Sequence, residues 1–327
     1  MTRMSQKPTV LVLMGGPDAE REVSLCSGKE VASALRAFGG GNRFEVIEKI
    51  IDKPSALQLK AMGGDVIFPV LHGQWGEGGP LQEILESIGL PYVGSRPKPA
   101  ALAMDKLATK TMLAAENVPT PPARQLMPDD ECDLEPPIVL KPVDDGSSVD
   151  LRICRTIQQI VAARRELHPK RGRLLAERYI NGREMTVGIL CGQALPLIEI
   201  IPGPSVEFYD YQAKYTRDDT KYIIDPALPP GVAEQCTAMA LKAFNVLGCR
   251  DVARADFMVD ERGPWFLEIN TMPGFTTHSL VPMAGRKIGL EMPALCAKLV
   301  NAALGRNKSP ANRNRQPSGR AKPISSR

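Results

Sequence analysis

The sequence of 327 residues lacks long runs of apolar side chains. An early apolar run, Val10–Met14, is far shorter than the roughly 20 residues that a membrane-spanning helix needs. It is also too short for the core of a signal peptide, so we expect a cytoplasmic protein without membrane insertion. The seven cysteines are scattered and form no Cys-x-x-Cys pair. This pattern indicates free thiols in a reducing compartment rather than a disulfide framework or a zinc site.

Acidic residues are missing from the end of the chain. Between Gly305 and Arg327 the sequence has seven Lys or Arg side chains and no Asp or Glu. Without these seven, 34 of the 41 basic residues remain against 37 acidic ones, so the body of the protein is slightly acidic. Such a balance gives no indication of a partner nucleic acid. We expect residues 305–327 to be a basic, disordered tail.

Strand and helix patterns alternate in the first hundred residues, whereas hairpin patterns dominate afterwards. The alternation predicts an open parallel sheet, with strands at 9–14, 44–51, 65–71 and 91–93, helices at about 20–38 and 81–88, and a glycine-rich loop at 72–80. Beyond it we expect helices at 100–117, 157–167 and 231–247, strands at 138–140, 149–154, 173–179, 185–191, 194–201, 252–259 and 264–269, and irregular stretches at 119–137 and 202–230.

The last of these hairpins carries oxygen-bearing side chains on one face. Asp256 and Glu268 are equally distant from a turn centred near residue 262, so they are expected to face each other. Asn270 lies two residues beyond Glu268 and therefore shares its face. Two carboxylates and an amide suit Mg²⁺, with phosphate oxygens and water completing the shell. The alternative is a solvent-exposed sheet face that carries ordinary acids.

Two lysines are candidates for binding phosphate groups. Lys141 ends an apolar strand, and the loop after it contains Gly146, Ser147 and Ser148. Such a loop can fold over a triphosphate and offer backbone N–H groups while the lysine supplies charge, although a plain polar hairpin is an equal alternative. Lys106 is a second candidate, but taken alone it is more readily explained as a surface lysine.

Two further segments suggest ligand sites. An apolar strand that ends in Glu177 suits a purine pocket, where the backbone around Arg178 and Ile180 would read the adenine edge while acids bind the exocyclic amine and the ribose. Ser279 follows a glycine-containing loop and precedes an expected helix. A helix N-terminus with a serine can receive a carboxylate, and the alternative is a simple helix cap.

In this order, the features resemble the D-alanine–D-alanine ligases of the ATP-grasp superfamily, over about residues 8–304. The matching stretches are 15–24, 72–79, 104–106, 140–149, 208–215 and the hairpin with its sequel to Leu280. The resemblance implies an ATP-grasp α/β fold of three domains, with an N-terminal open parallel-sheet domain and two α+β domains that sandwich ATP. The implied divisions are 1–100, 101–184 and 185–304, followed by the tail at 305–327.

The resemblance also implies a reaction. ATP would phosphorylate the carboxylate of a first D-alanine, and the amine of a second would displace the phosphate to give D-alanyl-D-alanine for peptidoglycan precursors. The alternatives are an ATP-grasp ligase with another acceptor, such as D-lactate or D-serine, and an inactive nucleotide-binding regulator. We also expect a homodimer.

Roles for individual residues follow from the resemblance. Glu22 would hold the first ammonium group and bind Ser147 and Tyr215, with His72 nearby. The oxyanion would be stabilised by Arg254 and the Gly274 N–H. The second carboxylate would be received by Ser279 and Leu280. The implied ATP-binding residues are Lys106, Lys141, Ser148, Glu177, Arg178, Tyr179, Ile180, Glu184 and Lys214, and the ligands of two Mg²⁺ or Mn²⁺ ions are Asp256, Glu268 and Asn270.

The sequence departs from the family pattern at three positions. Gly78 replaces an aspartate, Asp150 stands where glycine is common, and Ala253 replaces a glycine. These departures raise questions of substrate fit and loop geometry rather than of reaction type. Tyr215 stands where D-lactate-using relatives carry a histidine. A neutral tyrosine predicts D-alanine over D-lactate as the acceptor.

Overall fold

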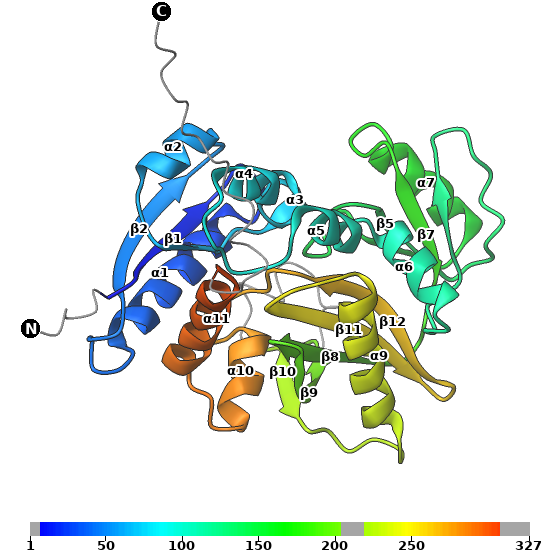
Figure 1. Cartoon of the computed structure of the whole chain (residues 1–327). Coiled ribbons are helices and arrows are strands. Elements are labelled where there is room, and N and C mark those ends of the chain that lie inside the picture. The colour runs from blue at the N-terminus through cyan, green and yellow to red at the C-terminus, as the bar shows by residue number, and fades with distance from the viewer. Residues whose placement is uncertain (1–6, 204–218, 308–327) are drawn as a thin grey trace, which may run out of the picture.

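The computed structural model describes residues 7–203 and 219–307, and its β-strands form three separate sheets (Figure 1). We call them the N-terminal, central and C-terminal sheets, after the order of their segments in the chain. They have three, four and five strands. Lys214 and Tyr215, which the resemblance placed in the site, lie outside the described residues.

The N-terminal sheet is parallel, with the strand order β2-β1-β3. The central strand is buried on both faces, and each residue of Val10–Met14 is at most 1% exposed, as expected for a parallel sheet covered by helices. The short strand expected at 91–93 contributes only an isolated bridge between Ile67 and Tyr92. The elements of this part are β1 (Thr9–Gly15), α1 (Arg21–Ala37), β2 (Glu45–Ile51), α2 (Ala56–Ala61), β3 (Val66–Pro69), α3 (Gly73–Glu77) and α4 (Pro80–Ile88).

Two helices, α5 (Pro97–Met104) and α6 (Lys106–Ala115), replace the single helix expected at 100–117. The break is at Asp105, whose backbone is extended and whose Oδ1 accepts a hydrogen bond from the Ala108 N–H at 2.8 Å. An aspartate that caps a new helix in this way ends the preceding one. The domain division expected at residue 100 therefore falls inside α5, and Lys106 becomes the first residue of α6.

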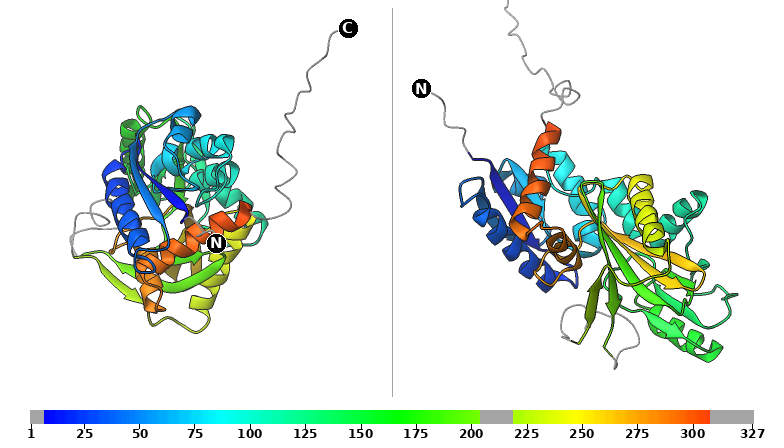
Figure 2. Two further views of the ribbon diagram at one scale, coloured as in Figure 1. Left: turned by 60° about the vertical axis from the view of Figure 1, so that its left-hand side comes forward. Right: turned by 90° about the horizontal axis from the view of Figure 1, so that it is seen from below.

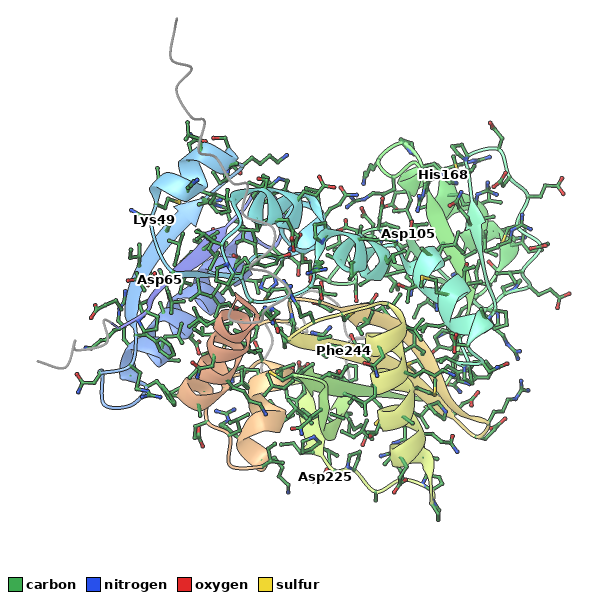
Figure 3. All side chains as sticks on the ribbon, viewed as in Figure 1. Lys49, Asp65, Asp105, His168, Asp225 and Phe244 are labelled. Atoms are coloured by element: carbon green, nitrogen blue, oxygen red, sulfur yellow. The ribbon has the colours of Figure 1, made fainter. Side chains whose placement is uncertain are left out.

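The central sheet is antiparallel, with the order β4-β7-β5-β6. Its helix α7 begins with a capping box formed by Thr156 and Gln159. The edge strand β4 lies in the proline-rich stretch that we expected to be irregular. His168, the C-cap residue of α7, is labelled beside this sheet in Figure 3. The elements are β4 (Ala123–Leu126), β5 (Ile138–Pro142), β6 (Arg152–Cys154), α7 (Ile157–Leu167) and β7 (Leu174–Arg178).

The C-terminal sheet is antiparallel, with the order β10-β9-β8-β11-β12. Helix α9 covers one face, where Phe244 packs among apolar side chains that include Ala255 and Phe257 of β11 (Figure 3). Arg254 and Asp256 alternate with these residues and so belong to the opposite face. The strand β10 lies in the stretch that we expected to be a loop. The elements are β8 (Arg183–Leu190), β9 (Gln193–Ile201), β10 (Lys221–Ile224), α9 (Val232–Val246), β11 (Val252–Asp260) and β12 (Gly263–Asn270).

The last two helices, α10 (Leu280–Lys287) and α11 (Met292–Asn307), return the chain to the N-terminal part. Figure 2 shows α11 beside α1 and the N-terminal sheet, and its Leu299 and Val300 share a core with Val31 and Leu35 of α1. No single helix in the described ranges has the length and apolar content to cross a membrane. Among these residues, α10 and α11 reach that limit only when taken together, and they are bent by 105° relative to each other.

The expected start of the tail at residue 305 is wrong, because residues 305–307 belong to α11. Arg306 is held by two hydrogen bonds to the carboxylate of Asp251, one of them 2.8 Å long. It also donates to the backbone oxygen of Tyr92 at 2.7 Å. The end of α11 therefore joins the N-terminal part to the C-terminal sheet.

Candidate active site

Two adjoining cavities lie where the three sheets meet. The smaller, about 70 Å³, has ionisable and small polar residues in its wall, and the larger, about 370 Å³, lies between the central and C-terminal sheets. Four residues line both: Lys106, Asp145, Gly146 and Glu268. A molecule in one cavity therefore meets a molecule in the other beside these residues.

Glu20 occupies the place in the smaller cavity that the resemblance assigned to Glu22. Its side chain is 7% exposed and lines the cavity, and its Oε1 accepts a hydrogen bond from Ser147 Oγ. Glu22 is exposed to solvent and does not line the cavity. The expected Glu22–Ser147 hydrogen bond is therefore wrong. The reason is helical geometry, because Glu20 is four residues before Ser24 and so continues the buried side of α1, whereas Glu22 is turned away.

His72 follows β3 and lines the same cavity. Its Nδ1 lies 2.9 Å from the backbone oxygen of Met272, an acceptor only, so Nδ1 carries the proton. The other ring nitrogen, Nε2, is buried without a hydrogen-bond partner among the described residues. Burial lowers the pKa of His72, although the nearby charge of Glu20 opposes that shift. A neutral imidazole with a free acceptor nitrogen can therefore accept a hydrogen bond from a ligand.

Glu77 forms hydrogen bonds with two loops that border the smaller cavity. Its Oε2 accepts from the Met272 N–H at 3.0 Å, and its Oε1 accepts from the Gly73 N–H at 3.3 Å. Burial, followed by the charge of Glu20, raises the pKa of Glu77 well above its ordinary value. Because Gly73 follows His72, this carboxyl group fixes the position of the histidine relative to the loop that follows β12.

The loop at 271–279 contributes the backbone N–H group of Gly274 to the wall of the cavity. The neighbouring N–H groups are bound by side chains: Met272 by Glu77, Phe275 by Ser27 at 3.1 Å, Thr276 by Ser279 at 2.9 Å and Thr277 by Glu30 at 2.7 Å. Within the described part of the chain, the Gly274 N–H has no such partner, and Gly274 lines the cavity. This donor is therefore available to an oxyanion.

Ser279 stands at the N-cap position of α10 but does not cap it with its side chain. Its Oγ accepts from the Thr276 N–H instead and also contacts the Thr276 hydroxyl at 2.9 Å. Ser279 and Leu280 line the smaller cavity, as does Arg254 of β11. The first turn of α10 therefore faces the cavity without a serine side chain over its N–H groups, which leaves it able to receive an anion.

The larger cavity has apolar walls from both sheets and polar residues at its ends. The apolar part includes Val139, Ile153, Met258 and Leu267. Such a slot suits a planar, weakly polar ring. All eight described residues that the resemblance assigned to ATP line it: Lys106, Lys141, Ser148, Glu177, Arg178, Tyr179, Ile180 and Glu184.

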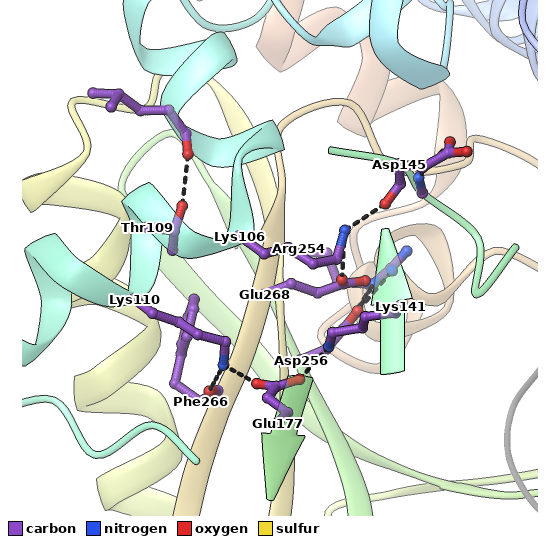
Figure 4. A network of polar contacts seen from close by, with 12 residues as sticks. Lys106, Thr109, Lys110, Lys141, Asp145, Glu177, Arg254, Asp256, Phe266 and Glu268 are labelled. Atoms are coloured by element: carbon purple, nitrogen blue, oxygen red, sulfur yellow. Dashed lines mark hydrogen bonds and ion pairs between the residues drawn. The ribbon is translucent and has the colours of Figure 1, made fainter. Parts of the chain in front are cut away.

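A buried ion-pair triad lies at the base of the larger cavity (Figure 4). Glu177 receives Lys141 on Oε2 at 2.5 Å and Lys110 on Oε1. All three side chains are less than 10% exposed. Burial raises the pKa of Glu177, but the two lysines outweigh it and hold the pKa below its ordinary value. Burial lowers the pKa of Lys141, and Glu177 and Glu268 together more than reverse that effect.

The face proposed for metal binding has the register that the sequence predicts. Asp256 is paired directly with Glu268, and Arg254 with Asn270, across β11 and β12. Glu268 borders both cavities, Asp256 the larger and Asn270 the smaller. In the structure, Arg254 binds both carboxylate oxygens of Asp256, at 2.9 and 2.8 Å, and Lys106 lies 3.4 Å from Glu268.

This donor set fits a hard cation such as Mg²⁺, which prefers carboxylate and amide oxygens. Thr186 Oγ1 donates to Asp256 Oδ1 at 2.6 Å and so orients the carboxylate. Among the described residues no three His, Cys, Asp or Glu side chains form a metal cluster. Binding of a cation here therefore requires the amide oxygen of Asn270 and the oxygens of a bound ligand in addition to the two carboxylates.

Comparison with known proteins identifies the family. The D-ala D-ala ligase C-terminus model matches residues 111–301, and the D-ala D-ala ligase N-terminus model matches residues 51–95. The D-alanine--D-alanine ligase B of Chromobacterium violaceum is 42% identical over 305 residues, which are 91% of this chain and 98% of the relative. The chain belongs to the D-alanine–D-alanine ligase family.

Solved structures of this family share the fold. The Bacillus anthracis D-alanine--D-alanine ligase complexed with ATP aligns with a TM-score of 0.80 and 30% identity, covering 93% of this chain and 99% of that one. The Coxiella burnetii enzyme aligns with a TM-score of 0.79 and 27% identity, covering 93% and 96%. The expected ATP-grasp fold is thereby confirmed.

The three departures from the family pattern have local explanations. Asp150 has a φ of +58°, a left-handed conformation that favours glycine but that aspartate also tolerates, and its Oδ2 accepts from Arg171 at 2.9 Å. Ala253 is fully buried among apolar side chains, on the opposite face of the sheet from Arg254. A Cβ atom at Gly78 would lie 2.4 Å from the backbone oxygen of Gln74, so this end of α3 has no room for the aspartate that is common in the family.

Three residues of the site were not among those predicted from the sequence: Glu20, Glu77 and Lys110. Each has a signal in the sequence. Glu20 has helical spacing from the apolar side of α1, and Glu77 lies inside the glycine-rich stretch that begins at His72. Lys110 is four residues after Lys106, which places both lysines on one face of α6.

Proposed function

We propose that the protein is an ATP-dependent ligase that joins two D-alanine molecules to D-alanyl-D-alanine and releases ADP and phosphate. The observation that supports this most strongly is the pair of adjoining cavities. One is a slot with apolar walls and a lysine at its base, and the other has carboxylate, imidazole and guanidinium groups in its wall. The residues that border both cavities are where a phosphoryl group would pass from nucleotide to amino acid.

In the first step, the carboxylate of one D-alanine attacks the γ-phosphorus of ATP, and ADP leaves. We assign the ammonium group of this D-alanine to Glu20, because it is a buried carboxylate in the smaller cavity. Lys106 and Lys141 would bind the phosphate oxygens from the two sides of the larger cavity. The lysine charges offset the negative charge that the carboxylate and the triphosphate bring together.

In the second step, the amine of the second D-alanine attacks the carbonyl carbon of the acyl phosphate. The tetrahedral intermediate then expels phosphate and forms the peptide bond. We assign its oxyanion to Arg254 and the Gly274 N–H, and the second carboxylate to Ser279, Leu280 and the first turn of α10. His72 Nε2 is an acceptor beside the reacting groups. Lys214 keeps the role in ATP binding that the resemblance implies, and Tyr215 keeps its predicted role in the choice of acceptor.

Two divalent cations complete the proposal. Asp256, Glu268 and Asn270 would hold Mg²⁺ or Mn²⁺ together with the oxygens of ATP. When bound, the ions would neutralise charge on the triphosphate. The protein residues orient these ligands, through Thr186 for Asp256 and Lys106 for Glu268. Arg254 also holds Asp256 in the structure, so cation binding would release its guanidinium toward the smaller cavity.

The deciding experiment supplies the purified protein with ATP, Mg²⁺ and a panel of D- and L-amino acids. We expect ADP release only with D-alanine present, together with one dipeptide per ADP. A second arm offers D-lactate or D-serine beside D-alanine at neutral pH. A neutral Tyr215 predicts mostly dipeptide, and a predominantly ester product would contradict this role of Tyr215. Nucleotide binding without any turnover on the panel would instead support the alternative of a catalytically inactive, nucleotide-binding regulator.

The cellular role follows from the product. We propose that the dipeptide enters peptidoglycan precursors and that the enzyme works in the cytoplasm, where ATP is available. The expected homodimer stays a prediction, which sedimentation or light scattering of the purified protein tests directly.

A further inference from the structure

Lys110 is buried beside the nucleotide cavity but does not line it. Its side chain is 5% exposed, and it contacts Glu177 and, at 3.4 Å, the backbone oxygen of Phe266. Lys141 and Glu177, by contrast, both line the larger cavity. A buried lysine is costly unless it is paired, so its presence here calls for a function or a compensating interaction.

The charges of the triad explain what Lys110 changes. Lys141 and Glu177 alone would be a neutral pair, with the lysine bound tightly by the carboxylate. Lys110 occupies the other carboxylate oxygen, so the three groups together carry one net positive charge beneath the cavity. Because the surroundings are buried, this charge is weakly screened by solvent and acts on an anion in the cavity.

The same contacts fix where Lys141 points. Glu177 has one oxygen for each lysine. Lys110 projects from helix α6, and its Nζ also donates to the backbone oxygen of Phe266 at 3.4 Å (Figure 4). With Lys110 on Oε1, the carboxylate group presents Oε2 to Lys141. Without Lys110, the carboxylate is free to rotate, and both of its oxygens are open to Lys141.

We propose that Lys110 is a positioning residue for nucleotide binding, which acts through Glu177 to orient Lys141 and to give the base of the cavity its net positive charge. This inference rests on the proposed function, because it takes Lys141 to bind the phosphates of ATP. It adds a residue that touches neither ATP nor D-alanine.

The test measures binding of ADP with Mg²⁺ by calorimetry, together with KM for ATP and for D-alanine. We expect Lys110→Met to weaken ADP binding and raise KM for ATP about tenfold, because the triad loses its net charge. KM for D-alanine should change less than twofold. Lys110→Arg, which keeps the charge, should stay within about threefold of the wild type. The matched control is Lys242→Met, because Lys242 pairs with Glu116 on the surface.

A double variant separates charge from structure. Lys110→Met with Glu177→Gln restores one net positive charge, and the glutamine oxygen still accepts from Lys141. We therefore expect it to bind ADP more tightly than Lys110→Met alone. If the double variant binds ADP as weakly as Lys110→Met, or if Lys110→Met binds it normally, the inference is wrong.

Failure of a variant to fold and failure of the proposed function give different results in these measurements. If Lys110→Met does not fold, as judged by thermal denaturation, Lys110→Gln takes its place as the uncharged variant, and ADP affinity equal to that of the wild type overturns the inference. If the wild-type protein binds ADP but makes no D-alanyl-D-alanine, the proposed function fails. The ADP affinities of the variants still decide the role of Lys110.

Discussion

Replacing Glu20 by glutamine would remove one negative charge from the smaller cavity while keeping the size of the side chain. Glu20 is buried and bound to Ser147, and it borders the place that we assign to the ammonium group of the first D-alanine. Glutamine can still accept a hydrogen bond from Ser147. The loss should therefore fall on binding of the ammonium group and not on the structure of the loop.

The size of the effect follows from burial. Removing one partner of a buried, hydrogen-bonded charge pair costs about 2–4 kcal/mol, or about 30- to 1000-fold. We expect kcat/KM for the first D-alanine to fall within that range. KM for ATP should change less than threefold, because Glu20 does not line the larger cavity. The assay is ADP release at varied D-alanine concentration, with dipeptide measured in parallel.

Glu22→Gln is the matched control, since it makes the same chemical change two residues along the chain. Its side chain is exposed, so solvent screens its charge, and we expect activity within twofold of the wild type. The reasoning is refuted if Glu22→Gln loses as much activity as Glu20→Gln, or if Glu20→Gln turns over D-alanine normally.

Four further predictions concern the metal face, the chain end and pH. Glu268→Gln should lower ligase activity about 100-fold or more at limiting Mg²⁺, and near-normal turnover would contradict the metal assignment. Ending the chain after Asn307 should leave the melting temperature unchanged. Arg306→Met should lower that temperature by several degrees, because the carboxylate of Asp251 loses both of its hydrogen bonds from Arg306, and an unchanged value would exclude a structural role for this ion pair. Burial lowers the pKa of His72, so its imidazole binds a second ring proton less readily in the folded protein than in the unfolded chain. The stability that His72 contributes is therefore present above its ordinary pKa of 6.5 and is lost as the pH falls. Melting curves of wild type and His72→Asn should converge below that pH, and a constant difference would count against this interpretation.

The metal face was predictable from the sequence, but for an incomplete reason. A turn centred at residue 262 pairs Asp256 with Glu268, and the structure has that pair. The turn itself pairs Asp260 with Gly263, which would place Leu267 opposite Asp256 if the register were regular. A bulge at Leu267 shifts the register by one residue and brings Glu268 into line. No pattern in the sequence reveals that bulge.

The remaining differences have two physical causes. Strands β4 and β10 are short edge strands with few buried residues, so their sequences lack the alternation that marks a half-buried strand. Arg306 and Lys110 look like surface residues in the sequence, because a charged side chain is buried only where a partner lies nearby in space. Their partners, Asp251 and Glu177, are 55 and 67 residues away along the chain.

Helix α11 has a consequence for how this protein is made. The core between α1 and the N-terminal sheet includes Leu295, Leu299 and Val300, which the ribosome adds almost last. The first domain to be synthesised therefore exposes an apolar face until nearly the whole chain has been released. Contacts so distant in sequence form slowly, and uncovered apolar surface promotes aggregation. Chains that stop before residue 292 lack the helix that covers this face, so they should aggregate more readily than the full chain.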